Sequence, residues 1–284
     1  MAAPQWTAGE IRRRLELRLA EGQPIVGFGA GCGMSACAAE AAGVDYINIY
    51  ATAVCRMKGL PSLLSWLPYG DVNQMTLEAG REILPLIRRT PVLAGIGAHD
   101  PRLCFPRLME QLKALGFSGV SNEPFICQYG SDFSEKMEAL GMGFSREAAL
   151  IEAAHQADLF AFGWVSTPTE AEAMARAGAD ALGVMARLSP EERSCSAEER
   201  LEFACRRTEE MVRSAQAVNP ALLFIAHGDA LESREAIARV LSRTGAHGYA
   251  TGSDGERLPA ISAIRNRVEA LHGLSIHKER IDLT

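Results

Sequence analysis

Residues 158–185 read DLFAFGWVSTPTEAEAMARAGADALGVM, and this stretch decides the fold class. It begins with a near-continuous apolar run, 158–165, which is typical of a strand buried on both faces of a parallel sheet. The TPTE motif at 167–170 then has the form of a helix N-terminus, with a capping threonine and a proline in the first turn. Gly178 ends that helix, and a second apolar run, 179–185, follows at once. The stretch therefore predicts a strand, a helix and a second strand parallel to the first.

The same alternation of apolar runs and helix-period segments extends along the chain. Eight runs are predicted to be strands: 24–29, 44–50, 91–97, 118–122, 158–165, 179–185, 221–227 and 246–251. Eight such units in about 250 residues predict an α/β protein with one closed (β/α)₈ barrel, a TIM barrel. The alternative is a doubly wound open sheet. Its dinucleotide-binding form needs GxGxxG after the first strand, whereas 27–33 reads GFGAGCG.

We expect a single TIM-barrel domain over residues 1–284, because no linker or change of composition divides the chain. An amphipathic segment at about 8–21 is expected to form an extra N-terminal helix, and the barrel to span about 24–275. Residues 51–72 are expected to form a long non-helical loop over the barrel mouth. A homo-oligomer is expected, with the N-terminal helix as a candidate contact.

Composition disfavours several classes of protein. The net charge of −6 disfavours nucleic acid binding, because phosphate backbones are bound by clustered Lys and Arg. Seven cysteines, with no secretory signal and no zinc-type spacing, favour reduced thiols in the cytoplasm. No apolar stretch is long enough for a membrane span. None of the lysines ends a predicted strand, which disfavours a Schiff-base aldolase.

Catalytic groups of TIM barrels lie just after the carboxyl ends of the strands. His227 closes the seventh apolar run and is followed by a flexible glycine, Gly228, so it is the foremost catalytic candidate. A core histidine with satisfied hydrogen bonds is the alternative interpretation. Gly252 and Ser253 follow the eighth run, and we expect them, with Gly228, to bind the anionic end of a substrate.

Acidic and imidazole groups follow the third and fourth runs. His99 and Asp100 come after the third run and Glu123 after the fourth, so these side chains are expected on neighbouring loops. His99 and Glu123 are candidates for proton transfer, and Asp100 with Glu123 for holding Mg²⁺ or Mn²⁺. Asp71, in the predicted turn at residues 68–71, is a further catalytic candidate. Asp71 and Asp100 could equally cap the helices that follow them.

The first and second runs offer groups for binding a small anionic substrate. Glycines in the turn at 27–33 would let backbone N–H groups approach an anion at a helix N-terminus, although tight packing is the alternative explanation. Asn48 and Tyr50 are two residues apart and so share one face of the second strand. No organic cofactor is expected. The candidates for substrate binding in this half of the barrel are Gly29, Gly31, Cys32, Asn48, Tyr50 and Asn122.

Several motifs together resemble the phosphoenolpyruvate hydrolase-like TIM-barrel family, which includes phosphonopyruvate hydrolases. They are PIVGFGAG (24–31), LPYGDVN (67–73), PVLAGI (91–96), GFSGV (116–120) and Gly252-Ser253 followed by ERLP (256–259). The resemblance spans about residues 8–275. It implies a barrel related to the phosphoenolpyruvate mutase–isocitrate lyase group, whose enzymes act on small 2-oxo acids and commonly use Mg²⁺.

The chain departs from the family pattern at three loops on the active-site side. The family has a histidine and a glycine-rich, threonine-containing stretch after the sixth strand, where residues 185–193 read MARLSPEER. It has an aromatic residue where this chain has Glu123, and His-Gly-Gly where this chain has His227-Gly228-Asp229. These departures bear on the substrate and on the reaction.

Three hypotheses of function follow. The first is a hydrolase that cleaves a C–P, P–O or C–C bond in a small phosphorylated or carboxylated 2-oxo acid. The second is a metal-dependent lyase, aldolase or isomerase with a different substrate, which the altered loop after the sixth strand favours. The third is a non-catalytic binding barrel, since barrels of this family also occur in plant virus-resistance proteins.

Overall fold

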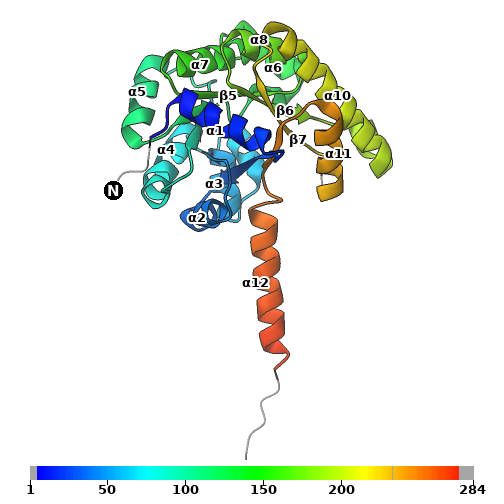
Figure 1. Cartoon of the computed structure of the whole chain (residues 1–284). Coiled ribbons are helices and arrows are strands. Elements are labelled where there is room, and N and C mark those ends of the chain that lie inside the picture. The colour runs from blue at the N-terminus through cyan, green and yellow to red at the C-terminus, as the bar shows by residue number, and fades with distance from the viewer. Residues whose placement is uncertain (1–4, 232, 275–284) are drawn as a thin grey trace, which may run out of the picture.

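Eight parallel strands close into a barrel in chain order, so the predicted fold class is confirmed (Figure 1). The computed structural model describes residues 5–231 and 233–274. The strands are β1 (Ile25–Ala30), β2 (Tyr46–Ile49), β3 (Val92–Gly95), β4 (Gly119–Ser121), β5 (Phe160–Val165), β6 (Ala181–Ala186), β7 (Leu223–Gly228) and β8 (Gly248–Thr251). Each falls within or beside the apolar run that predicted it.

Helices surround the barrel and connect successive strands. They are α1 (Ala8–Ala20), α2 (Gly33–Ala41), α3 (Ala51–Met57), α4 (Val72–Ile83), α5 (Phe105–Leu115), α6 (Ser131–Ala139), α7 (Phe144–Gln156), α8 (Pro168–Arg176), α9 (Pro190–Arg193), α10 (Ala197–Val218), α11 (Arg234–Thr244) and α12 (Arg257–His272). Short 3₁₀ turns lie at η1 (Ser62–Trp66), η2 (Leu84–Leu86) and η3 (Ile126–Tyr129). Among the described residues, none of these helices combines the length and apolar character needed to cross a membrane.

Local signals account for the helix ends. The Thr167 side chain caps α8 by accepting a hydrogen bond from the backbone N–H of Glu170, as the TPTE motif predicts. Gly116 and Gly245 adopt the left-handed conformation just after α5 and α11, where residues with a side chain are strained. The chain can therefore turn directly from each of these helices into the next strand.

The core has two layers. An outer layer lies between the sheet and the helices, and an inner layer fills the barrel with side chains such as Ile25, Phe160 and Ile225. Ile11 and Leu15 of α1 belong to the inner layer, so this helix closes the amino-terminal end of the barrel. The predicted extra N-terminal helix is present, but its apolar face is used within its own chain. The carboxyl end of the barrel is the end left for a site.

Residues 51–72 are not the non-helical loop that was expected. They contain α3, whose residues Ala51 to Arg56 are all buried, and the 3₁₀ turn η1. Tyr50 precedes α3 without a side-chain capping bond, so the sequence carries no start signal for this helix. Burial against the barrel stabilises α3 in place of a cap.

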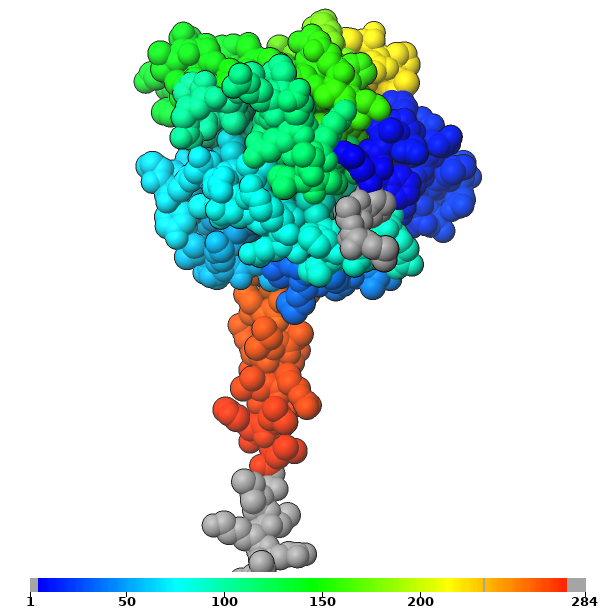
Figure 2. Space-filling model, turned by 90° about the vertical axis from the view of Figure 1, so that its left-hand side faces the viewer, coloured from blue at the N-terminus to red at the C-terminus, as the bar shows by residue number. Residues whose placement is uncertain are grey.

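Helix α12 stands away from the barrel. Figures 1 and 2 show it projecting from the body of the molecule, and none of its residues is buried. The predicted barrel region, about 24–275, included this segment. In the structure, the eighth helix of the barrel does not pack on the barrel of its own chain, and residue 275 lies outside the described residues.

Candidate active site

A cavity of about 380 Å³ opens at the carboxyl end of the barrel, formed by residues from loops after several strands. This is the end where TIM barrels place their active sites. Its lining includes one histidine, three acidic residues, one arginine and several aromatic rings: Tyr50, Thr52, Arg56, Ser62, Trp66, Glu123, Phe125, Gln128, Trp164, Met185, His227, Gly228, Asp229, Leu231, Tyr249, Ala250, Thr251, Gly252, Ser253 and Asp254.

His227 is held in one orientation at the end of β7. Its Nδ1 lies 2.9 Å from the carbonyl oxygen of Ala250, and its ring packs between those of Trp164 and Tyr249. Because a carbonyl oxygen can only accept a hydrogen bond, Nδ1 carries the proton and Nε2 is left as a free acceptor. Burial lowers the pKa of His227, which favours the neutral ring. The imidazole is therefore suited to accept a proton.

Burial has the opposite effect on Glu123, where it favours the protonated form. It is 5% exposed and accepts a hydrogen bond of 2.9 Å from the Thr52 hydroxyl. Burial raises its pKa to about 8, against the smaller effects of the Thr52 hydrogen bond and of the Arg56 charge. At neutral pH the carboxyl group is mostly protonated, so it can donate a proton into the cavity.

Arg56 places a guanidinium group in the cavity wall, where it forms a buried ion pair with Glu256. It lies on α3, is 3% exposed, and its Nε donates to the Glu256 carboxylate. Its Nη1 donates to the Tyr50 hydroxyl at 3.3 Å, and Nη2 donates to the carbonyl of Gly29. Sequence analysis did not identify Arg56 as a site residue. The sequence feature that could have identified it is a single charged residue between the largely apolar segment ATAVC (51–55) and Met57.

Trp164 was also not identified in the sequence. Its indole Nε1–H is buried and has no hydrogen-bond acceptor among the described residues. A buried donor without a partner is costly, and an oxygen of a bound ligand would satisfy it. Trp164 lies within a predicted strand whose apolar pattern gave no reason to separate it from the core.

The loops after β7 and β8 line the cavity as expected. Gly228, Gly252 and Ser253 are all part of its wall. The backbone N–H of Gly252 donates to the Asp254 carboxylate at 2.7 Å, and the Tyr249 hydroxyl donates to the same side chain at 3.1 Å. These two hydrogen bonds to Asp254 stabilise the conformation of the loop after β8.

The glycine-rich turn after β1 binds a carboxylate of its own chain. Gly31 N–H donates to Glu256 Oε1 at 2.7 Å, and the Ser35 hydroxyl donates to the same oxygen at 2.5 Å. Gly29 packs directly against the Tyr50 ring, and Cys32 precedes α2. Neither Gly29, Gly31 nor Cys32 lines the cavity, so the oriented N–H dipoles expected there for a substrate face Glu256 instead.

Two asparagines predicted to bind substrate link strands behind the cavity. Asn48 Nδ2 donates to the Ser121 hydroxyl at 2.9 Å. Asn122 Nδ2 donates to Glu147 at 2.7 Å, and Asn122 Oδ1 accepts from the backbone of Trp164 at 2.6 Å. Both are buried and outside the cavity lining, whereas Tyr50 is part of it.

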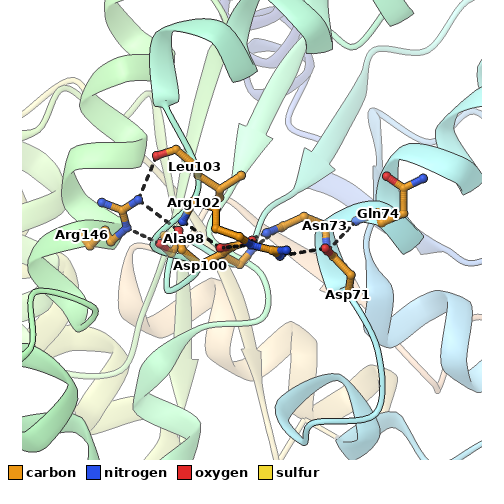
Figure 3. A network of polar contacts seen from close by, with 9 residues as sticks. Asp71, Asn73, Gln74, Ala98, Asp100, Arg102, Leu103 and Arg146 are labelled. Carbon is orange, nitrogen blue, oxygen red and sulfur yellow. Dashed lines mark hydrogen bonds and ion pairs between the residues drawn. The ribbon is translucent and has the colours of Figure 1, made fainter.

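Asp71, His99 and Asp100 form no part of the cavity lining. Asp71 caps α4 by accepting from the backbone N–H groups of residues 73 and 74. Arg102 bridges it to Asp100, with Nη2 at 3.0 Å from Asp71 and 2.7 Å from Asp100 (Figure 3). The helix cap that was the alternative for Asp71 is therefore present, and the charge of Asp100 is paired. Burial lowers the pKa of His99.

The expected metal site is not assembled by these side chains. Asp100 is engaged by Arg102, and Glu123 alone of the two lines the cavity. Within residues 5–231 and 233–274, no group of three or more His, Cys, Asp or Glu side chains is arranged to hold a metal ion. Mg²⁺ is commonly bound by one or two carboxylates with water molecules completing its shell, and of the expected pair only Glu123 lines the cavity.

Comparison with known proteins places this barrel in a family. Residues 10–274 match the phosphoenolpyruvate hydrolase-like family. The chain belongs to this family. This phosphoenolpyruvate hydrolase-like chain is 35% identical over 268 residues to ToMV susceptible protein tm-1(GCR26) of Solanum lycopersicum. The alignment covers 94% of this chain and 36% of the tomato protein, so the chain spans about a third of that relative.

Solved structures of similar fold include hydrolases, lyases and a phosphomutase. One is 2,3-dimethylmalate lyase, a PEP mutase/isocitrate lyase superfamily member, with a TM-score of 0.58, 18% identity and coverage of 99% of this chain and 93% of that chain. Another is phosphonopyruvate hydrolase in complex with oxalate and Mg²⁺, with a TM-score of 0.58, 17% identity and coverage of 93% and 88%. At this identity the likeness shows that the phosphoenolpyruvate hydrolase-like chain shares their fold.

Proposed function

We propose that this phosphoenolpyruvate hydrolase-like barrel is an enzyme that cleaves a C–P, P–O or C–C bond in a small carboxylated or phosphorylated 2-oxo acid. One observation carries the proposal: a cavity at the carboxyl end of the barrel is lined by His227, whose pKa burial lowers, by Glu123, whose pKa burial raises, and by Arg56. These are a base, an acid and a fixed cation, which together suit an anionic substrate. Family membership supports the substrate class.

The charge of Arg56 is paired with Glu256, so we expect the guanidinium to bind a substrate oxygen through the two N–H groups that its protein partners leave free. The guanidinium group is held by three hydrogen-bond partners and cannot turn away, so its field is preorganised. The free indole N–H of Trp164 offers a further donor to a substrate oxygen. A cavity of about 380 Å³ accommodates a substrate of a few carbon atoms.

Two proton transfers complete the proposed reaction. In the hydrolytic form, a water molecule adds through its oxygen to the carbon or phosphorus of the scissile bond and gives its proton to Nε2 of His227. The electron pair of the broken bond remains on the leaving atom, which takes the proton of Glu123. The raised pKa of Glu123 and the lowered pKa of His227 place the correct form of each at neutral pH.

A lyase of the same site is the second candidate. In that form His227 takes the proton of a substrate hydroxyl group, and the oxygen forms a carbonyl double bond as the adjacent carbon–carbon bond breaks. The leaving carbon keeps the electron pair of that bond and takes the proton of Glu123, and no water is consumed. The altered loop after β6, with the short helix α9, favours a changed reaction. Turnover in H₂¹⁸O separates the two, because only hydrolysis incorporates solvent oxygen into a product.

The test is a turnover and thermal-shift panel on the full chain. Phosphoenolpyruvate, phosphonopyruvate and oxaloacetate are offered with Mg²⁺, with Mn²⁺ and with EDTA. We expect turnover of a 2-oxo acid or its phosphorylated relative, and a loss of about 10²- to 10⁴-fold in kcat/KM in His227→Asn and in Glu123→Gln. His155→Asn and Glu152→Gln, on the exposed face of α7, are matched controls.

His99→Asn decides between the two candidate histidines, since His99 lies outside the cavity. Activity that survives His227→Asn but not His99→Asn would place the chemistry elsewhere. Absence of both turnover and binding across the panel would favour a non-catalytic binding barrel. The similarity to a ToMV susceptible protein gives that outcome its own support.

A further inference from the structure

The cavity at the carboxyl end of the barrel has a continuous wall of rings. Neighbouring ring centroids in this wall lie 5.5, 6.4, 5.6 and 6.1 Å apart. The rings come from η1, from the loop after β4, and from β5, β7 and β8. We call them the ring wall, and they are, in order, Trp66, Phe125, Trp164, His227 and Tyr249. Rings in such contact offer a large and rigid apolar surface to a ligand.

The polar atoms of the ring wall are largely engaged within the protein. The indole N–H of Trp66 donates to the carbonyl oxygen of Phe125 at 2.8 Å. The Tyr249 hydroxyl donates to Asp254 at 3.1 Å. Met185 of β6 also lines the cavity, between the strands that carry two of the rings. The surface that this part of the cavity offers to a ligand is therefore mainly apolar.

The charged groups of the cavity suit a singly charged ligand better than a doubly charged one. Arg56 is the one Lys or Arg side chain among the described lining residues, and it is paired with Glu256. Asp229 and Asp254 add two carboxylates to the lining, and the first of them pairs with Arg193 at 3.1 Å. Phosphoryl and phosphonyl groups are bound by several cations or metal ions at once. The described lining supplies no such cluster of positive charge.

A single carboxylate has a suitable place beside Gly252. A methyl group built on this glycine would lie 3.5 Å from Cε1 of His227 and 3.9 Å from Nη1 of Arg56, so this corner of the cavity is bordered by both side chains. The guanidinium has two N–H groups that its protein partners leave free, and a carboxylate can accept both. Because His227 also belongs to the ring wall, a ligand held at this corner extends along the rings.

We propose that the ring wall binds the apolar end, an aryl or branched alkyl group, of a 2-oxo acid whose carboxylate lies at Arg56, which rests on the proposed function above and narrows its substrate class. An apolar group gains free energy when it is buried against rings, whereas a phosphonate or a second carboxylate loses its hydration there. The preferred ligand is therefore a monoanion with an apolar end.

The matching substrate for hydrolysis is an acylpyruvate, R–CO–CH₂–CO–COO⁻, in which R is the apolar group. Water adds through its oxygen to C4 and gives its proton to Nε2 of His227. The C3–C4 bond breaks, its electron pair stays on C3, and C3 takes the proton of Glu123. The products are pyruvate and the acid R–COOH, and proton exchange with solvent restores both side chains.

The test of binding uses acids of the form X–CH₂–CO–COO⁻, which differ only in X. Phenylpyruvate, 2-oxobutanoate and phosphonopyruvate place a phenyl, a methyl and a phosphonate group at X. Isothermal titration calorimetry on the full chain, with Mg²⁺ and again with EDTA, gives the dissociation constants. We expect phenylpyruvate to bind at least about tenfold more tightly than the other two acids. Binding of phosphonopyruvate as tight as that of phenylpyruvate, or no binding of phenylpyruvate, overturns the proposal.

Met185 allows the apolar end to be located. Met185→Gln places an amide beside the ring wall with little change of volume, so it should weaken phenylpyruvate about fivefold and leave 2-oxobutanoate nearly unchanged. Met185→Leu should keep the preference of wild type. Met142→Gln, at a half-buried position outside the cavity lining, is the matched control. Equal weakening of both acids in a folded Met185→Gln chain, with folding checked by circular dichroism, would mean that the apolar end lies elsewhere.

Turnover separates this ligand class from the proposed function itself. Pyruvate release from benzoylpyruvate and from phosphonopyruvate is compared on the full chain, and benzoylpyruvate should have the higher kcat/KM. Tight binding of phenylpyruvate without turnover of either acid would support the apolar ligand and contradict the proposed function. A kcat/KM for phosphonopyruvate equal to or above that for benzoylpyruvate would support the proposed function and overturn the apolar ligand.

Discussion

At the scale of single residues, burial assigns different protonation states to the two ionisable groups proposed for catalysis. Glu123 is almost completely enclosed and has one neutral hydrogen-bond donor, Thr52, so its protonated form is favoured. His227 gives its Nδ1 proton to a carbonyl oxygen and is favoured in its neutral form. The same low-polarity cavity therefore yields an acid and a base.

The raised pKa of Glu123 predicts a pH dependence of stability. Its folded pKa, about 8, lies above the ordinary value of 4.5. The stabilisation is fully present below pH 4.5 and is lost as the pH rises to 8, because ionisation is easier in the unfolded chain. Between pH 5 and 8 the free energy of unfolding of wild type should fall relative to Glu123→Gln by at most about 1.4 kcal/mol per pH unit. Urea denaturation at several pH values measures this.

Glu152→Gln is the control for that measurement, since Glu152 is exposed and its substitution should leave the pH dependence of wild type unchanged. Parallel curves for wild type and Glu123→Gln would show that the carboxyl group titrates normally. Glu147 also has a pKa raised to about 8, chiefly by burial and to a smaller extent by the charge of Glu123, so part of the difference between wild type and Glu123→Gln comes from Glu147.

The candidate site residues also show which features of the site can be predicted from the sequence and which cannot. The position after a strand correctly predicted that Glu123 and His227 would line one cavity. The same rule also selected Asp71 and Asp100. In the structure, Asp71 caps a helix and Asp100 pairs with Arg102. Sequence position shows which loop a residue lies on, but not whether a neighbouring N–H or guanidinium group turns it away from the centre.

At the scale of elements, strands were predictable and one helix was not. Strands of a parallel barrel are mostly apolar, so the run 221–227, which contains most of β7, is visible in the sequence. Helix α3 begins directly after β2 with no capping side chain, and its stability comes from packing that a sequence does not display. Because α3 carries Arg56 and Thr52, missing this helix meant missing the cation of the cavity and the partner of Glu123.

Helix α1 is expected to contribute stability by closing the barrel. Ile11 is fully buried among the residues of the inner core. Ile11→Ala should lower the free energy of unfolding by about 2–5 kcal/mol, because it removes buried methylene groups and leaves a cavity. Leu17→Ala, on the same helix but 60% exposed, should change it by less than about 0.5 kcal/mol. Equal effects in denaturant unfolding would mean that α1 does not close the barrel.

At the scale of the whole molecule, all eight strands of the barrel are paired, but the last helix, α12, does not pack against the barrel. Eight strand–helix units predicted closure correctly, since each unit has its own local signals. They could not predict where the last helix packs, because an amphipathic pattern is the same whether its apolar face meets its own barrel or another. The junction at Glu256 decides the direction of α12, and its bonds to Gly31 and Arg56 are long-range.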